Sequence, residues 1–450
     1  MTRETIFVNL VAAGLLAASG QAASLRAGAA QVDITPEEPV WMAGYAARTH
    51  PSEGVRLRLK AKALALEDAA GQRVVLISTD LIGLPHELTD WVAARIQSEY
   101  GLERAHLVLN SSHTHAGPVV RGNRETMYEL TPEQTAVLDR YRRRLADELM
   151  NVAGAALGAL KPARIDFAQG EAHFAVNRRV ATPKGYVIGV NPRGPSDPSV
   201  PVLRVTGLDG KVLALLFGYA CHNTTLGQDF YQISGDYAGY AQQELEREFP
   251  GAVALFFQLC GGDQNPNPRS TVELAQQHGR ALAAEVARVA KGTMSPVSGR
   301  LKTAFRLIEL PLAPHTREQF EAEARDGTTN QQRRAARMLK LYDERKAPRT
   351  VEYPVQAVRF EHGFTLIALG GEVVVEYALW ARREFVGEPL MVAGYSNDVM
   401  SYIPTAQILA EGGYEPLESM VYYGMPGPYT TEVEDRVKSG ITAVWKRVTR

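Results

Sequence analysis

Short apolar runs of strand length recur along the chain, and polar or glycine-containing turns bound each of them. An unbroken apolar run of about four to eight residues is typical of a strand buried on both faces. We expect such strands at Arg73–Thr79, His106–Asn110, Val212–Ala220, Val253–Leu259, Phe364–Leu369 and Leu390–Gly394. Longer segments with helical periodicity alternate with these runs, at Pro132–Leu160, Tyr237–Glu248, Thr271–Ala290 and Val373–Phe385. The alternation predicts an α/β fold in which mixed β-sheets are flanked by helices.

The chain shows no domain boundary after its first residues. From Leu25 onward there is no low-complexity linker, no repeat of fixed period and no sharp change of composition. We therefore expect a single catalytic domain over residues 24–450. Within it, the segment Thr316–Lys346 is highly charged and helix-prone, which predicts a solvated helical excursion. A lid or a partner surface is the alternative for this segment.

The N-terminal segment has the pattern of an export signal. Arg3 precedes an apolar run over residues 6–18, and small residues follow that run. The run is shorter than the about 20 apolar residues of a membrane span, so it favours a signal peptide over residues 1–23, cleaved near Ala22 or Ala23. A buried first helix is the alternative. We expect a periplasmic or secreted protein without stable membrane insertion, because no later run is long enough to span a bilayer.

Charge and cysteine content exclude two further classes. The 49 Lys and Arg against 50 Asp and Glu give a net charge of −1. Nucleic-acid binding requires an excess of basic residues, so we expect no nucleic-acid partner. The two cysteines, Cys221 and Cys260, are too few for a disulfide scaffold, and they are either one bridge between neighbouring strands or two separate buried thiols. With ten histidines present, a metal site is expected to use nitrogen and oxygen ligands.

Polar residues follow all six predicted buried strands. In open α/β sheets, ligands bind beyond the carboxyl ends of the strands, where loops present side chains from a rigid frame. We therefore expect one shared site at these ends. The residues at these positions whose types are able to bind a metal or take part in catalysis are Asp80; His113 and His115; His222; Asp263 and Asn265; Glu372; and Asn397, Asp398 and Tyr402. Any one of them taken alone is also typical of a capping or turn residue.

The segment His113-Thr114-His115 is the strongest local signal. Residues two apart on an extended segment face the same side. Both imidazoles can therefore approach one ion, or one can bind the ion while the other faces the substrate. His222 is a further candidate ligand because it follows an apolar strand. A histidine at such a position, taken alone, is more often a hydrogen-bonded core residue than a ligand.

The chain resembles the neutral/alkaline, non-lysosomal ceramidase family over nearly all of the mature sequence. The motifs that carry this resemblance occur in order and at the family's spacing. They are Gln31–Pro36 and Met42–Ala46; His113–Pro118, similar to H-T-H-S-G-P with Ala116 at the Ser position; Asn177-Arg178; Ile233–Tyr240, similar to I-S-G-D-x-x-G-Y; Gly371-Glu372; and Asn397 to Tyr402 followed by Tyr414-Glu415.

The resemblance implies a neutral-ceramidase-like catalytic domain with one zinc ion (Zn²⁺). Its implied ligands are His113, His222, Glu372 and Tyr402. His115 and Arg178 would face the reacting amide, and Tyr414 would polarise or stabilise it. Zinc bound to imidazole and carboxylate with one open position lowers the pKa of a bound water to about 7, which makes a nucleophile for amide hydrolysis. Asp80 and Asp236 are candidates for orienting the ligand imidazoles, and for each of them a turn residue is the equal alternative.

The resemblance predicts a zinc-dependent amidohydrolase that cleaves the N-acyl bond of ceramide or a related N-acyl lipid to fatty acid and sphingoid base or amine. The alternative substrate is a smaller amide, ester or acylated glycan. A catalytically silent binding protein is a third hypothesis, which the retention of Arg178 and Tyr414 disfavours. A lipid substrate would bring transient membrane contact; the oligomeric state is not predicted.

Two departures from the family bear on the substrate. Asn265 stands in the stretch Gly262–Asn267 where the family has Ser. Family members that act on ceramide usually continue into a C-terminal β-sandwich domain, whereas this sequence ends at Arg450. Substrate contacts are therefore expected to differ from those of the family.

Overall fold

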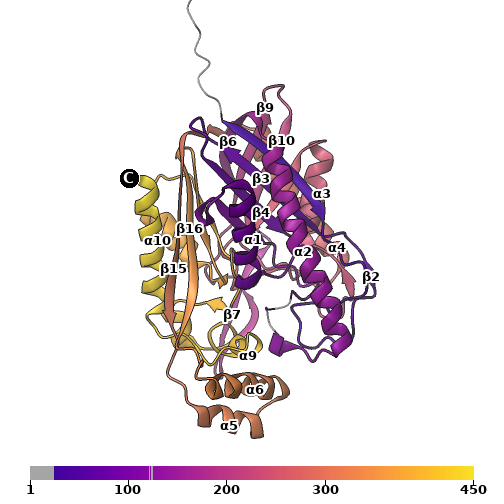
Figure 1. Cartoon of the computed structure of the whole chain (residues 1–450), viewed down its shortest axis with the longest axis vertical. Coiled ribbons are helices and arrows are strands. Elements are labelled where there is room, and N and C mark those ends of the chain that lie inside the picture. The colour runs from indigo at the N-terminus through magenta and orange to yellow at the C-terminus, as the bar shows by residue number, and fades with distance from the viewer. Residues whose placement is uncertain (1–24, 121, 123–124) are drawn as a thin grey trace, which may run out of the picture.

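Figure 1 shows the computed structural model of the protein. Three pairs of parallel strands, each joined by a helix, organise its fold. They are β4 (Arg73–Thr79), α1 (His86–Tyr100) and β5 (Leu107–Ser111); β10 (Val212–Tyr219), α3 (Asp236–Glu248) and β12 (Val253–Gln258); and β17 (Phe364–Leu369), α7 (Glu376–Glu384) and β19 (Leu390–Ala393). Parallel strands need a crossover connection that covers the sheet, so both strand faces are buried. These six strands are the six predicted apolar runs, with every end within one residue of the prediction.

The structure describes residues 25–120, 122 and 125–450. The predicted signal peptide over residues 1–23 lies outside the described residues, and it stays a prediction. No helix in the described part of the chain is both long and apolar enough to cross a bilayer.

The larger sheet has the strand order β12-β10-β9-β6-β1-β3-β4-β5, with β14 paired to β6. Its further strands are β1 (Arg26–Asp33), β3 (Lys60–Glu67), β6 (Lys161–Glu171), β9 (Ser199–Gly207) and β14 (Ser295–Pro296). The sheet curves until its two ends meet. The Gln258 backbone N–H donates to Asn110 Oδ1 at 2.8 Å, and Asn110 Nδ2 donates to the Gln258 carbonyl at 3.2 Å. The carboxyl ends of β5 and β12 therefore lie together.

The second sheet brings the third parallel pair to the same place. Its order is β15 (Ser298–Pro311), β16 (Thr350–His362), β17 and β19, antiparallel except for β17 and β19. Two isolated backbone bridges, Leu259 to Ala393 and Asn110 to Ser396, join it to the ends of β12 and β5. The strand ends of both sheets thus converge.

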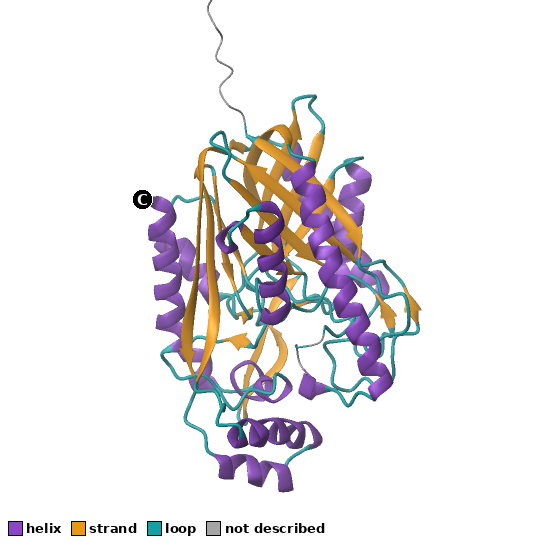
Figure 2. Cartoon of the chain, viewed as in Figure 1, coloured by secondary structure: helices purple, strands orange, loops and turns teal. Residues whose placement is uncertain are grey.

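The elements form four layers, with helices outside and the two sheets inside (Figure 2). Helices α1, α2 (Pro132–Gly158), α3 and α4 (Val272–Lys291) pack on the larger sheet, and α7 and α10 (Val433–Thr449) pack on the second. The core between the sheets includes Leu64, Leu76, Leu216, Leu366 and Met391. This arrangement confirms the predicted α/β fold with mixed sheets flanked by helices.

Local signals explain where the long helices begin. Thr131 caps α2, and the Thr131 and Gln134 side chains form a capping box around Pro132. Thr271 caps α4 through the Leu274 backbone N–H. These side chains satisfy backbone donors that the first helical turn leaves unpaired.

Two segments differ in detail from the expectation. The predicted helix Val373–Phe385 begins instead with the short strand β18 (Glu372–Val373), which pairs in parallel with β20 (Tyr402–Ile403). Pairing with a distant segment overrides the local helical pattern there. The charged segment forms two helices, α5 (Arg317–Asp326) and α6 (Thr329–Asp343), around a small core of their own, as the predicted excursion requires.

All remaining elements except η1, which precedes β5 at its amino end, surround the converging strand ends. The remaining elements are the hairpin β7 (Ala175–Thr182) and β8 (Gly185–Asn191) with β13 (Gln264–Pro266); the pair β2 (Gly54–Val55) and β11 (Gln232–Ile233); η1 (Arg104–His106) and η2 (Glu125–Met127); and α8 (Ala406–Glu411), the π-helix η3 (Tyr414–Glu418) and α9 (Ser419–Tyr422). Cys221 and Cys260 are separate buried free thiols.

Candidate active site

Three donor atoms converge where the parallel strands end. His113 follows β5, His222 follows β10 and Glu372 follows β17. The Nε2 atoms of His113 and His222 each lie 3.0 Å from Glu372 Oε2. All three side chains are buried, with at most 1% of their surface exposed. Nitrogen and carboxylate donors in this arrangement are suited to a metal ion.

Backbone carbonyls orient the two imidazoles. His113 Nδ1 lies 2.6 Å from the Ile82 carbonyl oxygen, and His222 Nδ1 lies 2.8 Å from the Gly261 carbonyl oxygen. A carbonyl only accepts, so each Nδ1 carries the proton and each Nε2 presents a lone pair. Burial, assisted by the Arg178 guanidinium, lowers the pKa of His222 to about 3, which keeps this imidazole neutral.

The prediction that Asp80 and Asp236 orient the ligand imidazoles is wrong. Asp80 accepts hydrogen bonds from the Lys60 backbone N–H and from Gln242 Nε2. Asp236 accepts hydrogen bonds from the backbone N–H groups of Leu226 and Tyr237. Both carboxylates therefore hold neighbouring backbone segments in place. The imidazole Nδ1 atoms of His113 and His222 are instead hydrogen-bonded to backbone carbonyl groups.

The backbone around the histidine pair is held in an uncommon conformation. His113 has φ = 65°, in the left-handed region that few non-glycine residues adopt. His115 lies against Gly44, where an added Cβ atom would come within 2.4 Å of His115 Nδ1. Gly44 has φ = 99°, so both the space and the backbone require glycine. His115 Nε2 lies 3.1 Å from His113 Nε2.

Tyr402 reaches the same cluster because β20 pairs with β18. The register sets Tyr402 directly beside Glu372. Tyr402 Oη lies 3.2 Å from His222 Nε2 and accepts a hydrogen bond from Arg178 Nη2 at 3.0 Å. Burial raises the pKa of Tyr402 well above its ordinary value, although Arg178 acts in the opposite direction.

A β-bulge places two arginines on one side of strand β7. The register with β8 shifts between Asn177 and Arg179, so Arg178 lies at the irregularity. Adjacent strand residues ordinarily face opposite sides, but here Arg178 and Arg179 are both buried and both bind Glu415.

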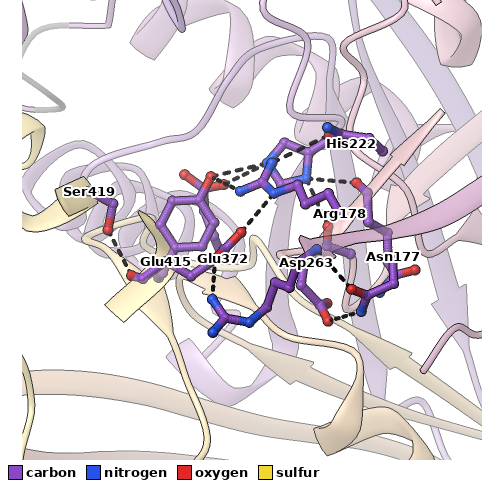
Figure 3. A network of polar contacts seen from close by, with 12 residues as sticks. Asn177, Arg178, His222, Asp263, Glu372, Glu415 and Ser419 are labelled. Atoms are coloured by element: carbon purple, nitrogen blue, oxygen red, sulfur yellow. Dashed lines mark hydrogen bonds and ion pairs between the residues drawn. The ribbon is translucent and has the colours of Figure 1, made fainter. Parts of the chain in front are cut away.

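Glu415 anchors this ion cluster from the π-helix η3. Arg178 Nε donates to Glu415 Oε1 at 2.8 Å, and Arg179 Nη1 donates to Oε2 at 2.5 Å. Burial opposes the ionisation of Glu415, but the two guanidinium groups prevail and lower its pKa. Figure 3 shows the contacts that link Arg178 to His222 on one side and to Glu415 on the other.

A cavity of about 310 Å³ opens above the cluster. His115, Arg178, Tyr402 and Tyr414 line it, together with Asn265. His113, His222 and Glu372 lie beneath this lining. The site therefore has a buried layer of metal-capable donors and a second layer that faces the cavity.

All seven residues named by the resemblance come together in the structure. The group of His, Cys, Asp and Glu side chains able to hold a metal ion, among the described residues, is His113, His115 and His222. This group includes His115, which the resemblance assigns to the reacting amide and not to the ion. The position of His115 in the cavity lining, and of Glu372 beside both other imidazoles, favours Glu372 as the third ligand.

Two contributors were not identified in the sequence. Tyr423 Oη donates a hydrogen bond to Glu372 Oε1, the oxygen opposite the one that faces the histidines. Glu415 joins both arginines of the bulge. The adjacent Tyr414-Glu415 pair was a sequence signal for Glu415, whereas nothing distinguishes Tyr423 from the other tyrosines near it.

Comparisons with known proteins place this site in a family. The sequence profile described as neutral/alkaline non-lysosomal ceramidase, N-terminal, matches residues 25–299. The chain belongs to this family. Neutral ceramidase from Pseudomonas aeruginosa is 27% identical over 344 residues, which are 70% of this chain and 50% of that protein. Neutral ceramidase A from Dictyostelium discoideum is 28% identical over 271 residues, 55% of this chain and 36% of that protein.

The fold is shared with a ceramidase of the same family. The crystal structure of neutral ceramidase from P. aeruginosa superposes with a TM-score of 0.73, covering 95% of this chain and 74% of that chain at 22% identity. This chain spans about half of the length of the P. aeruginosa relative in the sequence match, and a smaller share of the D. discoideum relative.

Proposed function

We propose that the protein is a zinc-dependent amidohydrolase that cleaves the N-acyl bond of ceramide or a related N-acyl lipid. The observation that carries this proposal is the two-layered site: metal-capable donors lie beneath a cavity lined by His115, Arg178 and Tyr414. The relatives that match the chain are named neutral ceramidases, which supports the substrate class. The products would be a fatty acid and a sphingoid base or amine.

In this proposal His113, His222, Glu372 and Tyr402 hold one zinc ion. The donor set and its spacing fit that ion. Zinc bound at 2.0–2.1 Å in a tetrahedron has ligand atoms about 3.3 Å apart. The atom pairs described above are 3.0–3.2 Å apart. Two imidazole lone pairs face one carboxylate oxygen here, and a cation would relieve the contact between these three acceptors.

The side chains in the cavity lining carry the remaining chemistry. Bound zinc supplies a Lewis acid that polarises a carbonyl group and lowers the pKa of a water molecule. Arg178 and Tyr414 are placed to donate hydrogen bonds to the carbonyl oxygen, on which negative charge develops during attack. His115 is placed to pass a proton to the departing amine. Glu415 keeps the Arg178 guanidinium charged and fixed.

A smaller amide, ester or acylated glycan is the second candidate substrate. The size of the catalytic cavity favours it, because about 310 Å³ lies at the lower end of the range for small-molecule sites. Asn265 also lines the cavity at a position where the family has Ser. The same metal and the same lining residues would serve either substrate.

One experiment separates these candidates. Purified protein is tested for metal-dependent release of fatty acid from a fluorescent short-chain ceramide, beside a panel of simple esters and acyl amides. His113→Ala is the test variant, and His173→Ala, which changes an exposed histidine, is the matched control. Ceramide turnover that depends on His113 supports the proposal. Turnover of the other substrates alone, with the same dependence, retains the zinc mechanism and overturns the ceramide assignment.

A further inference from the structure

The catalytic cavity adjoins a second, larger hollow. This hollow has a volume of about 460 Å³. The two share four lining residues, which are Tyr45, Thr224, Gln228 and Arg269. These four residues therefore lie within reach of a substrate that occupies the catalytic cavity.

Arg269 is the charged group at the junction. Within the described residues, the catalytic cavity is lined by two arginines, Arg178 and Arg269, and by no carboxylate. Arg178 forms an ion pair with Glu415. The Arg269 guanidinium forms no hydrogen bond or ion pair with any residue that the structure describes. Asp229 lines only the second hollow and does not pair with Arg269.

Asn265 adds hydrogen-bond donors to the same cavity. Its Oδ1 atom accepts from Arg178 Nη1 at 3.4 Å and from Thr224 Oγ1 at 3.3 Å. A guanidinium only donates, so this contact fixes which end of the Asn265 amide is oxygen. The amide –NH₂ group forms no hydrogen bond with a described residue, and its two donors remain for a molecule in the cavity.

These positions favour an anionic partner over a neutral one. A guanidinium recognises carboxylate and phosphate oxygens through two parallel hydrogen bonds. Arg269 is exposed, and a plain ceramide, which carries no charge, would leave its guanidinium bound to water alone. An anion at the junction would pair with Arg269 and meet no opposing carboxylate in the catalytic cavity.

We propose that Arg269 is the centre of an anion-binding subsite, so that the preferred substrate is an acyl amide carrying a carboxylate or phosphate group at the junction of the two hollows. The proposal rests on the function proposed above, because it takes the scissile amide to lie at His115 and Arg178. Arg269 is then a specificity-determining residue and Asn265 a second contact.

The test uses two matched pairs of substrates. N-lauroylglycine and N-lauroylethanolamine differ by a carboxylate against a hydroxyl, and a short-chain ceramide 1-phosphate differs from its ceramide by a phosphate. The wild-type protein is compared with Arg269→Gln, with Arg269→Lys as the conservative variant, and with Arg193→Gln as a control at an exposed arginine outside both hollows. The readout is the ratio of kcat/KM, anionic over neutral, within each pair.

We expect the wild-type protein to favour the anionic member of at least one pair by about tenfold, as a charged hydrogen-bonded pair allows. Arg269→Gln should bring this ratio close to one, Arg269→Lys should retain part of it, and Arg193→Gln should retain all of it. The preferred pair tells carboxylate from phosphate. Equal ratios for the wild-type protein and Arg269→Gln would overturn the subsite.

A binding measurement separates this proposal from the proposed function. Calorimetric titration of the zinc-loaded protein with both members of each substrate pair needs no turnover. If no acyl amide is hydrolysed but the anionic member of a pair binds about tenfold more tightly and Arg269→Gln removes the difference, the hydrolase assignment fails and the subsite stands. If neither the N-lauroyl pair nor the ceramide pair shows tighter binding of its anionic member to the wild-type protein, the subsite fails whatever the activity.

Discussion

The site has two halves that the fold positions in different ways. The strand-end half consists of His113, His222 and Glu372, each placed directly after a buried parallel strand. The hairpin half consists of Arg178 on β7 and of Tyr414 and Glu415 on the π-helix η3. The first half is held by backbone hydrogen bonds of two packed sheets, and the second by one bulge and one buried ion cluster.

The comparison shows that the two halves depend on different forces. Backbone carbonyl groups of the converging loops orient the two imidazoles of the strand-end half, so the orientation of these rings does not depend on a single side chain. In the hairpin half, Arg178 and Arg179 share the carboxylate of Glu415. Because buried charges need a partner, loss of that carboxylate would leave Arg178 without a counter-ion and Arg179 with Glu411 alone.

Removing a donor from the strand-end half is expected to have the largest effect, and it falls on activity. His113→Ala should remove bound zinc and lower kcat by about 10³-fold or more, since a Lewis acid contributes several kcal/mol to the transition state. The fold should survive, because sheets and not the ion position these strands. Zinc content by mass spectrometry and circular dichroism test both statements; retained zinc with retained activity would contradict the ligand assignment.

Glu415→Ala should have the largest effect on stability. It leaves Arg178 buried without a counter-ion and Arg179 with Glu411 alone, and we expect the free energy of unfolding to fall by about 3–5 kcal/mol. The matched control is Glu411→Ala, which removes a partner of Arg179 nearer the surface and should cost at most about 1 kcal/mol. Urea unfolding of both variants measures the difference. Equal losses would show that the hairpin half does not depend on Glu415.

Tyr423→Phe is expected to have a smaller effect, which falls on metal affinity. It removes the hydrogen bond to Glu372 Oε1 while keeping the ring. Loss of a partner behind a metal ligand typically weakens metal binding by about 10–100-fold. Competition with a zinc chelator measures this affinity, and Tyr422→Phe serves as the neighbouring control. An unchanged affinity would mean that Glu372 is held by the β18–β20 pairing alone.

The smallest expected effect is a pH dependence of the stability that Glu415 contributes in the hairpin half. Folding lowers the pKa of Glu415, so the folded state releases this proton more readily than the unfolded state. The stability that Glu415 contributes is then complete above the ordinary glutamate pKa of about 4.3 and declines as the pH falls through the folded value. The difference in unfolding free energy between the wild-type protein and Glu415→Gln should narrow below about pH 4. A constant difference from pH 7 to pH 3 would contradict this.

The sequence predicted the strand-end half for a physical reason. Strands of parallel crossover units are buried on both faces, so they appear as unbroken apolar runs, and the residue after each run marks the carboxyl edge of the sheet. The same reasoning placed Asp80 near the site, and the motif Ile233–Tyr240 placed Asp236 there, but their role as imidazole partners was wrong. Which acceptor reaches an imidazole depends on loop geometry, which no local pattern encodes.

The hairpin half was accessible from the sequence only through the family resemblance. Arg178 and Arg179 lie in a half-exposed antiparallel strand, and nothing in the local pattern shows that a bulge turns both inward. The predicted helix at Val373–Phe385 fails at its start for a similar reason, since the pairing of Glu372 with Tyr402 joins segments 30 positions apart.

By itself, the sequence determined the α/β class, the six buried strands and the residues at their ends, because burial of apolar strands and the chemistry of histidine and carboxylate are local properties. Only the tertiary structure decided that the larger sheet curves until β5 meets β12 and that Arg178 and Arg179 share Glu415. It also decided that Tyr423 supports Glu372, and that Arg269 lies between two hollows without a hydrogen-bond or ion-pair partner among the described residues. These features depend on contacts between distant segments, whose geometry is set by packing of the whole chain.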